Sequence, residues 1–186
     1  MGFAIAEKFA EAGARVILIS GPVSLFPRHK NIELISVKTA SEMFTRCLNI
    51  FDKTDGAILS AAVADYRPKD PVSYKMKSKA PDMVLTLEPN PDIAFELGKI
   101  KKSSQFLAGF ALETNDEMKN ALEKRQKKNF DFIVLNSLND KGSGFNSNTN
   151  KITIIGKDNK AKEYKLKSKE EVASDILDYL NDHFYK

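Results

Sequence analysis

The sequence predicts an α/β fold of the Rossmann type, in which helices cover both faces of a mostly parallel sheet to give three layers. Two observations lead to this class. Short, continuously apolar runs alternate with amphipathic helical stretches as far as Asn136, and the connections between them are short. After that point two strand-like runs are separated by a short polar segment, which predicts an antiparallel extension at the C-terminal end.

The first third of the chain sets this alternation. Phe3, Ala6 and Phe9 recur at helical spacing until Gly13, and Thr39 with Glu42 forms a capping box that opens a second helix. Apolar runs bounded by turn residues predict the buried strands. In chain order we expect a helix over 2–13, strands over 15–20 and 32–37, a helix over 39–51 and a strand over 56–64.

The rest of the chain repeats the pattern. Asn90 is the expected N-cap of the next helix, with Pro91 at its first position, and Thr114 with Glu117 is the expected cap of the one after. Ser168 and Glu171 form a capping box for a final helix. The remaining expected elements are strands over 83–88, 106–112, 130–136, 151–156 and 162–167, and helices over 90–100, 114–128 and 168–180.

Two irregularities stand out in this single predicted domain of residues 1–186. Residues 67–82 are polar, punctuated by proline and too long for an ordinary turn, which predicts a mobile flap. In addition, doubly wound sheets usually begin with a strand and a glycine-rich turn, whereas this chain begins on a helix. Either the fold has no such strand or the first strand is missing from these residues.

Composition excludes several classes of protein. No apolar stretch approaches the roughly 20 residues that cross a bilayer, and the start does not read as a signal peptide. The single Cys47 allows no internal disulfide and fits a reducing cytoplasm. With only His29 and His183 besides that cysteine, a zinc site is not expected, and no metal ligands can be assigned.

The net charge of +4 is unevenly spread. Residues 67–79 and residues 119–128 each carry five Lys or Arg against one acid. Two such clusters on a nearly neutral chain favour a polyanionic ligand over a general nucleic-acid surface, because neither cluster interleaves aromatic residues in the pattern of a nucleic-acid module. Each cluster alone also fits an ordinary solvated surface.

Three predicted strand ends carry polar residues, and ligands of open parallel sheets bind at such ends. In SAAVADYRP (60–68) small residues precede Asp65, which can accept ribose hydroxyls or hold a cation, or can simply cap a turn. In NPDI (90–93), Asp92 favours sugar hydroxyls or merely complements the helix dipole. Lys124 and Lys128 share one helical face near its end, a position that the dipole also favours.

A fourth candidate, Phe110, is expected at a strand end where its ring can stack on a base, although the residue taken alone favours a core position. Together the four features describe a nucleotide site with a small-residue platform, an acid for the sugar and lysines for the phosphates.

Seven motifs in fixed order carry a resemblance to a known family: SGPVSL, SAAVADYRP, KMKSK, EPNPDI, GFALET, KKNFDFIVLN and GFNSNTNKITII. Over residues 1–180 the chain resembles bacterial phosphopantothenate–cysteine ligase of coenzyme A biosynthesis. The resemblance implies a cytoplasmic homodimer that uses CTP and Mg²⁺. It implies activation of 4′-phosphopantothenate as an acyl-cytidylate with release of pyrophosphate, followed by amide formation with cysteine.

The resemblance also assigns residues. It implies that Lys75, the first lysine of KMKSK, supports cytidylate formation. It implies that Lys75 also binds the cytidine nucleotide, together with ten further motif residues: Ser60, Ala61, Asp65, Asn90, Pro91, Asp92, Ile93, Phe110, Lys124 and Lys128. The region around GFNSNTNKITII and KEYKLK is the surface that we expect a second subunit to cover.

One departure from the family concerns its beginning. Members carry a strand and a glycine-bearing loop with an asparagine directly before the MGFAIAE helix, and often a decarboxylase domain further upstream. Three explanations follow: a truncated gene or start site, a fragment, or a partner chain that supplies the strand. Other classes stay open, namely a catalytically impaired nucleotide-binding or dimerisation fragment, or an NAD(P)-dependent oxidoreductase whose glycine fingerprint would lie in the absent segment.

Overall fold

The computed structural model describes residues 1–76, 82–113, 115–137 and 147–185. Its helices are α1 (Gly2–Glu11), α2 (Ala40–Phe51), α3 (Ile93–Ile100), α4 (Glu117–Lys127) and α5 (Lys169–Phe184). Among the described residues, none of the helices has the length and apolar content required to span a membrane.

The strands are β1 (Val16–Ser20), β2 (Ile32–Ser36), β3 (Gly56–Leu59), β4 (Tyr66–Pro68), β5 (Leu87–Pro89), β6 (Phe106–Glu113), β7 (Phe132–Ser137), β8 (Thr149–Asn150), β9 (Ile152–Gly156), β10 (Ala161–Glu163) and β11 (Lys167–Ser168). Five of them form a sheet in the order β10-β9-β7-β6-β3. Its β3, β6 and β7 are mutually parallel, whereas β9 and β10 add antiparallel edges. The predicted mostly parallel sheet with an antiparallel C-terminal extension is therefore confirmed.

Helices cover both faces of this sheet because its strands alternate their side chains between two apolar clusters. Phe132 and Val134 face α1 and α5, where they pack with Ile5 of α1 and Ile176 of α5. Ile133 and Leu135 face the other way, into the cluster that includes Met43 of α2, Leu97 of α3 and Ala121 of α4. This period of two along a buried strand produces the three-layer class that the sequence predicted.

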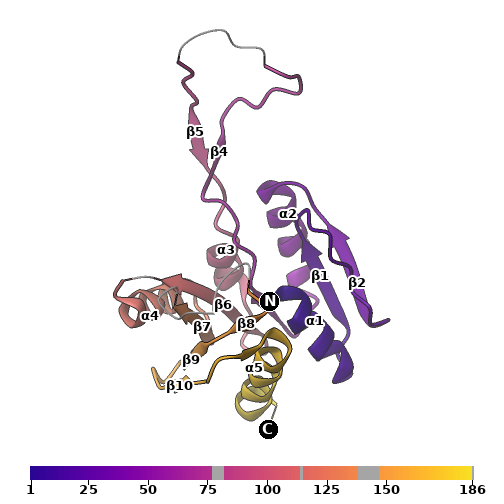
Figure 1. The fold of residues 1–186 in the computed structure, drawn as a ribbon, viewed down its shortest axis with the longest axis vertical. Helices are drawn as coiled ribbons and strands as arrows, with labels where there is room; N and C mark the ends of the chain where they lie inside the picture. Colours follow the sequence, from indigo (N-terminus) through magenta and orange to yellow (C-terminus); the bar gives the residue numbers. More distant parts are fainter. Residues whose placement is uncertain (77–81, 114, 138–146, 186) are drawn as a thin grey trace.

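The sheet is split. β1 and β2 form a separate parallel pair, and β3 is hydrogen-bonded to β6 alone. Figure 1 shows this pair standing beside the five-stranded sheet, with α1 running next to α5. Helix packing holds the two parts together, since α1 contacts α5 and α2 contacts α3.

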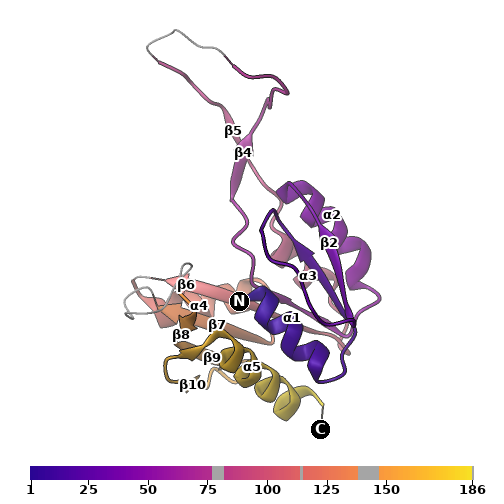
Figure 2. The same cartoon turned by 45° about the vertical axis from the view of Figure 1, so that its right-hand side comes forward.

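A long arm projects from the body between β3 and α3, and both views show it standing clear of the layers (Figures 1 and 2). At its base β4 pairs with β5 in antiparallel register, with Arg67 opposite Glu88. The predicted strand over 83–88 is therefore wrong for residues 83–86, because only Leu87–Pro89 is a strand and it belongs to the arm rather than to the main sheet. The predicted flap of 67–82 lies in this arm, and its residues 77–81 are outside the described part.

Three predicted boundaries also need correction. The predicted strand 56–64 ends at Leu59, because the backbone from Ser60 to Ala64 leaves the sheet. The N-cap of α3 is Asp92 rather than Asn90, so Pro91 precedes the helix. The N-cap position of α4 is Asp116, in a left-handed conformation, while Thr114 lies outside the described residues. The capping residues Thr39 and Ser168 are confirmed.

Candidate functional site

One long, open cavity of about 1450 Å³ runs between the β1–β2 pair and the five-stranded sheet. It extends past the carboxyl end of β3 to the start of α3, where the Lys128 side chain reaches Asp92 from the end of α4. We call this part the site end and define it by ten residues that the sequence singled out and that all line the cavity: Ser60, Ala61, Asp65, Asn90, Pro91, Asp92, Ile93, Phe110, Lys124 and Lys128.

The segment after β3 forms the floor of the site end. Its backbone is held by Asn90, whose side-chain amide donates to the Ala64 carbonyl at 2.8 Å while its own N–H donates to the Asp65 carbonyl at 2.7 Å. Arg67 in turn donates to the Asn90 side-chain oxygen at 3.3 Å. Asn90 is thus a clamp between two loops, a role that its position before a helix did not reveal. Ala61 and Asp65 are left exposed on this floor.

Asp92 has two partners at the start of α3. Its Oδ1 accepts the N–H of Phe95 at 3.1 Å, which caps the helix, and also lies 3.1 Å from Nζ of Lys128. The carboxylate therefore links the beginning of α3 to the end of α4. The dipole of α3 is oriented so that a negative charge at this position is favourable.

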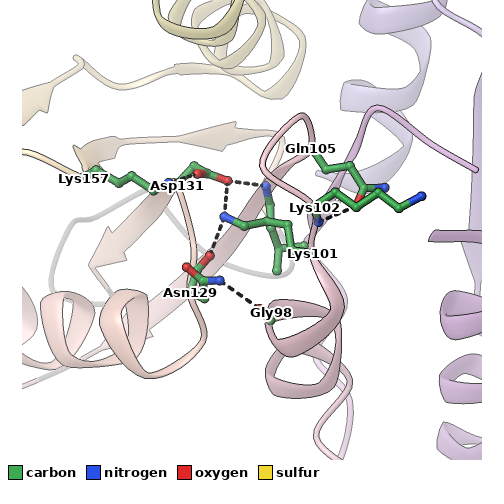
Figure 3. Close-up of polar contacts among 8 residues, drawn as sticks. Gly98, Lys101, Lys102, Gln105, Asn129, Asp131 and Lys157 are labelled. Atoms are coloured by element: carbon green, nitrogen blue, oxygen red, sulfur yellow. Dashed lines mark hydrogen bonds and ion pairs between the residues drawn. The ribbon is translucent and has the colours of Figure 1, made fainter. Parts of the chain in front are cut away.

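A network beneath the site end fixes the position of Lys128. Gly98 of α3 lies so close to the Lys128 carbonyl that a Cβ there would overlap it. The Asn129 side chain donates to the Gly98 carbonyl at 2.8 Å, and Lys101 Nζ donates to the Asn129 carbonyl at 2.9 Å, as Figure 3 shows. The end of α4 is consequently held against α3 by both shape and hydrogen bonds.

Lys101 anchors this network in the core through Asp131. Its side chain is 6% exposed and that of Asp131 only 2%, and their charged atoms lie 2.8 Å apart. Asp131 Oδ2 also accepts the N–H of Leu107 at 2.7 Å, and Lys157 contacts its other oxygen (Figure 3). Both oxygens of this buried carboxylate therefore have partners, which hold the side chain in one position.

Lys124 is one turn before Lys128 and has a different environment. Burial lowers the pKa of its ammonium, and the nearby charge of Lys128 lowers it further, while Glu113, Asp92 and Asp65 oppose the shift. No salt bridge of Lys124 occurs within the described part of the chain. A half-buried cation next to a second cation is a favourable place for an anion, which would relieve both effects.

Phe110 and Lys75 occupy contrasting positions. Phe110 lies in the middle of β6 rather than at a strand end. It is half-buried and packs against the cluster beneath α1 and α5, so it contributes to the core as well as to the cavity wall. Lys75 is exposed on the arm and does not line the cavity. The structure thus separates Lys75, expected both to act in catalysis and to bind nucleotide, from the other ten residues expected to bind nucleotide.

The sequence analysis missed two amides at the same end of the sheet. Asn136 in β7 and Asn150 in β8 both line the cavity, and the Asn150 amide donates to the Asn136 oxygen at 3.2 Å. Asn136 follows a buried apolar run, so the rule that picked out Asp65 could also have found it. Among the described residues there is no cluster of three His, Cys, Asp or Glu side chains that could hold a metal ion.

The comparisons with known proteins agree with this geometry. The family model for the C-terminal domain of DNA/pantothenate metabolism flavoproteins matches residues 1–184. The chain belongs to this family. The resemblance that the motifs indicated is confirmed at this level.

Two curated relatives and one solved structure illustrate the family. The chain is 50% identical over 177 residues to a "Cysteine/Cysteine sulfinic acid decarboxylase" from an unknown prokaryotic organism. It is 44% identical over 177 residues to "Coenzyme A biosynthesis bifunctional protein CoaBC" of Bacillus subtilis. These matches cover 95% of this chain but only 49% and 43% of the relatives, so the chain spans about half of their length.

The solved C-terminal domain of a CoaBC protein superposes on 97% of this chain with a TM-score of 0.80 at 35% identity, and 80% of that domain is covered. A pantothenate metabolism flavoprotein from Streptococcus pneumoniae gives a TM-score of 0.82 at 21% identity, which shows a shared fold.

Proposed function

We propose that this chain is the ligase part of a coenzyme A biosynthesis enzyme and joins 4′-phosphopantothenate to cysteine. The observation that supports this most strongly is the gathering of Asp92, Lys124 and Lys128 on one cavity, above a floor of small residues. That arrangement suits a nucleotide, since the floor accommodates a flat group and the lysines accommodate phosphates. CTP is the nucleotide that the family resemblance favours.

Each residue of the site end has a role in this proposal. Ser60 and Ala61 lie under the nucleoside, Asp65 and Asp92 accept hydroxyl groups of the ribose, and Phe110 closes the wall. Asn90 holds the floor against the start of α3 through its hydrogen bonds, while Pro91 and Ile93 line the entrance. Lys124 and Lys128 compensate the charge of the phosphates, for which their shared helical face is suited.

The reaction proceeds in two displacements. A carboxylate oxygen of 4′-phosphopantothenate forms a bond to the α-phosphorus of CTP, and the bond to pyrophosphate breaks. The amine of cysteine then attacks the activated carbonyl carbon, a proton leaves the nitrogen, and CMP departs. Fixed positive charge stabilises the developing negative charge of the first step, so lysines are the residues that matter there.

Mg²⁺ belongs to the proposal as a companion of the triphosphate. This ion usually keeps several waters and binds one or two carboxylates together with substrate phosphates, so it needs no dedicated protein cage. Asp65 is exposed on the cavity floor and is the carboxylate best placed to hold it. When bound, the ion supplies additional positive charge to the phosphates.

The arm supplies a surface for a second subunit. It exposes several large apolar side chains outside any apolar cluster, namely Tyr66, Val72, Tyr74, Met76, Met83, Val84, Leu85 and Leu87. Val84 is 91% exposed. We assign the dimer contact to this arm rather than to the C-terminal hairpin, part of whose motif lies outside the described residues and whose β9 is buried in the sheet. Lys75 then serves the cavity of the second copy.

The proposal is tested by pyrophosphate release from CTP, with 4′-phosphopantothenate present or omitted. Release that requires both compounds supports the ligase, whereas preferential binding of NADH in calorimetry would replace it with an oxidoreductase. ATP in place of CTP tests the choice of base. Because one relative carries a decarboxylase name, carbon dioxide release from cysteine and from cysteine sulfinic acid is measured as well, and its appearance without pyrophosphate would contradict the proposal.

A further inference from the structure

Three polar side chains join the arm to the site end. From residue 64 to residue 76 and from residue 82 to residue 90, every residue is exposed except Arg67, Glu88 and Asn90. These three contact one another and belong to neither apolar cluster. The side-chain contacts that hold the base of the arm are therefore polar.

The guanidinium of Arg67 has partners on two sides. Its Nε donates to Oε1 of Glu88 at 2.8 Å, and its Nη2 lies 2.7 Å from the same oxygen. Arg67 and Glu88 are directly opposite in the β4–β5 register, so this pair connects the two strands of the arm. The remaining nitrogen, Nη1, donates to the side-chain oxygen of Asn90 at 3.3 Å. One planar group thus binds both the arm and the residue that holds the floor.

Asn90 extends this link to the floor of the site end. Because its side-chain oxygen accepts from Arg67, which has donors only, its amide nitrogen is directed to the Ala64 carbonyl, to which it donates at 2.8 Å. The backbone N–H of Asn90 donates to the Asp65 carbonyl at 2.7 Å. The position of Ala64 and Asp65 therefore depends on a residue that Arg67 orients.

The exposure of the ion pair indicates an effect on position rather than on stability. The side chains of Arg67 and Glu88 are 41% and 36% exposed, and ion pairs this accessible contribute little to the free energy of unfolding. A guanidinium that binds two partners in fixed directions still restricts their relative geometry, which the single ammonium of a lysine does not. Replacing Arg67 by lysine should therefore loosen this geometry while the chain stays folded.

The lysines that are proposed to bind phosphates have separate support. Lys128 pairs with Asp92, and the Asn129 side chain holds the end of α4 to the Gly98 carbonyl of α3. Arg67 instead contacts the floor and the arm that carries Lys75. A change at Arg67 is thus expected to alter how the arm and the floor meet more than how tightly the phosphates bind.

We propose that Arg67 is a positioning residue that fixes the base of the arm to the floor of the site end through Asn90. Its effect on turnover rests on the proposed ligase function, in which the floor supports the nucleotide and Lys75 acts in the first displacement. Because Lys75 is proposed to serve the second copy, Arg67 ties the floor of one cavity to the lysine that acts in the other.

Arg67→Lys in the chain of residues 1–186 tests this link, because lysine keeps the charge but cannot bind both partners. Glu88→Gln is a second variant, which keeps an acceptor oxygen but removes the charge that holds the guanidinium. Arg46→Lys, at an exposed arginine of α2, is the matched control. Hydrogen exchange of single amides and the thermal unfolding midpoint are measured for all of them without nucleotide.

The Asn90 amide reports on the floor, and the Lys69 amide, which bonds across the two segments of the arm, reports on the arm. Both are expected to exchange about tenfold faster in the first two variants and at an unchanged rate in the control. The Tyr164 amide, bonded at another edge of the structure, keeps its rate, and the thermal midpoint changes by less than about 3 °C. An unchanged Asn90 rate in Arg67→Lys, or an equal acceleration of all three amides, would overturn the proposal.

Pyrophosphate release tests the consequence for turnover. In Arg67→Lys we expect kcat to fall at least about tenfold while KM for CTP changes less than about threefold, because misplacement of the arm weakens the transition state and leaves the phosphate site intact. An increase in KM at constant kcat would show that Arg67 binds the nucleotide directly and would overturn the positioning role.

A double-mutant cycle with Asn90→Ala tests the route. If Arg67 acts through Asn90, adding Arg67→Lys to Asn90→Ala lowers kcat by no more than about twofold further. A second full tenfold loss would mean that Arg67 acts by another route, against the proposal. If the unchanged chain releases no pyrophosphate, the ligase proposal fails, and the exchange rates still decide whether Arg67 joins the arm to the floor.

Discussion

Nζ of Lys128 and Oδ1 of Asp92 lie 3.1 Å apart, which joins the last turn of α4 to the cap of α3 at the entrance of the site end. The pair holds a cation where phosphates are proposed to bind, but it also partly neutralises that cation. A phosphate group must therefore compete with Asp92 for Lys128.

Replacing Asp92 by asparagine tests this competition. Asparagine keeps an oxygen that can cap α3 but removes the negative charge, so Lys128 becomes available to an anion. We expect inorganic pyrophosphate to bind a few-fold more tightly by calorimetry, the effect of a partly exposed ion pair worth about 0.5–1 kcal/mol. Glu96→Gln, which removes an acid paired with Lys99 on the same helix, is the control and leaves pyrophosphate affinity unchanged. Weaker binding in Asp92→Asn would contradict the competition.

The environment of Lys124 predicts that the protein takes up protons when it binds an anionic ligand. Burial and Lys128 lower the pKa of its ammonium in the folded chain, so between the folded and unfolded pKa values the unfolded chain binds more protons. The charged lysine therefore lowers the free energy of unfolding at neutral pH. This destabilisation is lost as the pH rises from the folded pKa to the unfolded pKa of Lys124. A bound phosphate raises the pKa again.

Calorimetry of CTP binding at alkaline pH, in buffers of different ionisation enthalpy, is expected to show proton uptake. Lys124→Gln removes this uptake, whereas Lys127→Gln, an exposed neighbour on the same helix, retains it. An uptake that survives in Lys124→Gln would place the titrating group elsewhere.

Lys75 is predicted to act in the cavity of the second copy. Lys75→Gln and Lys128→Gln are each expected to abolish pyrophosphate release. Lys75→Gln lacks the lysine on the arm, and Lys128→Gln lacks a lysine that binds the phosphates. Subunits of the two variants that are unfolded, mixed and refolded together should recover roughly a quarter of the activity, because half of the dimers are mixed and each has one intact site. If Lys75 serves its own cavity, the mixture stays inactive.

The ion pair of Lys101 and Asp131 is predicted to be a large contributor to stability. Asp131→Asn leaves the Lys101 ammonium buried without its counter-charge, a change that typically costs about 3–5 kcal/mol. Urea unfolding measures the loss. Lys160→Gln, which removes a partner from the exposed pair with Asp158, should change the free energy of unfolding by less than about 0.5 kcal/mol. Similar small effects for both variants would show that Asp131 has no special role.

Gly98→Ala is predicted to destabilise the protein, although alanine normally stabilises a helix relative to glycine. In an exposed helix interior, glycine to alanine stabilises by about 0.5–1 kcal/mol, but a Cβ at Gly98 would overlap the Lys128 carbonyl. Gly98→Ala should therefore lower the urea midpoint and weaken CTP binding by displacing Lys128. Ser41→Ala on the exposed face of α2 is the control and leaves both quantities nearly unchanged. A more stable Gly98→Ala chain would mean that α3 and α4 can separate without cost.

Sequence patterns predicted the elements whose cause is local. Thr39 and Ser168 cap their helices through contacts three residues away, so the spacing alone was sufficient. Asn90 looked like a cap by the same reasoning, but its partners are Ala64 and Arg67, more than twenty residues distant, and they turn it into a clamp. Asp92, two residues later, caps the helix instead.

The candidate site shows the same difference between what local sequence predicts and what depends on long-range packing. Parallel strand ends meet at one edge, so Asp65 and Asp92, which lie between β3 and α3, could be expected together from the order of strands and helices. Lys128 lies at the end of α4, just before β7, and only its side chain reaches Asp92. The support of Lys128 by Gly98 and Asn129, and the separation of Lys75 from the cavity, depend on packing between distant elements. No pattern within a short window carries that information.

The projecting arm also has a consequence for handling the protein. Proteases cut extended backbone that fits their clefts, and the arm presents Lys69 and Lys75 on exposed chain away from the layered body. Brief trypsin treatment should therefore nick the isolated subunit there first and leave two fragments held together by the sheet and its helices. Subunits whose arms are covered by a second copy should resist, so the rate of nicking becomes a simple gauge of assembly.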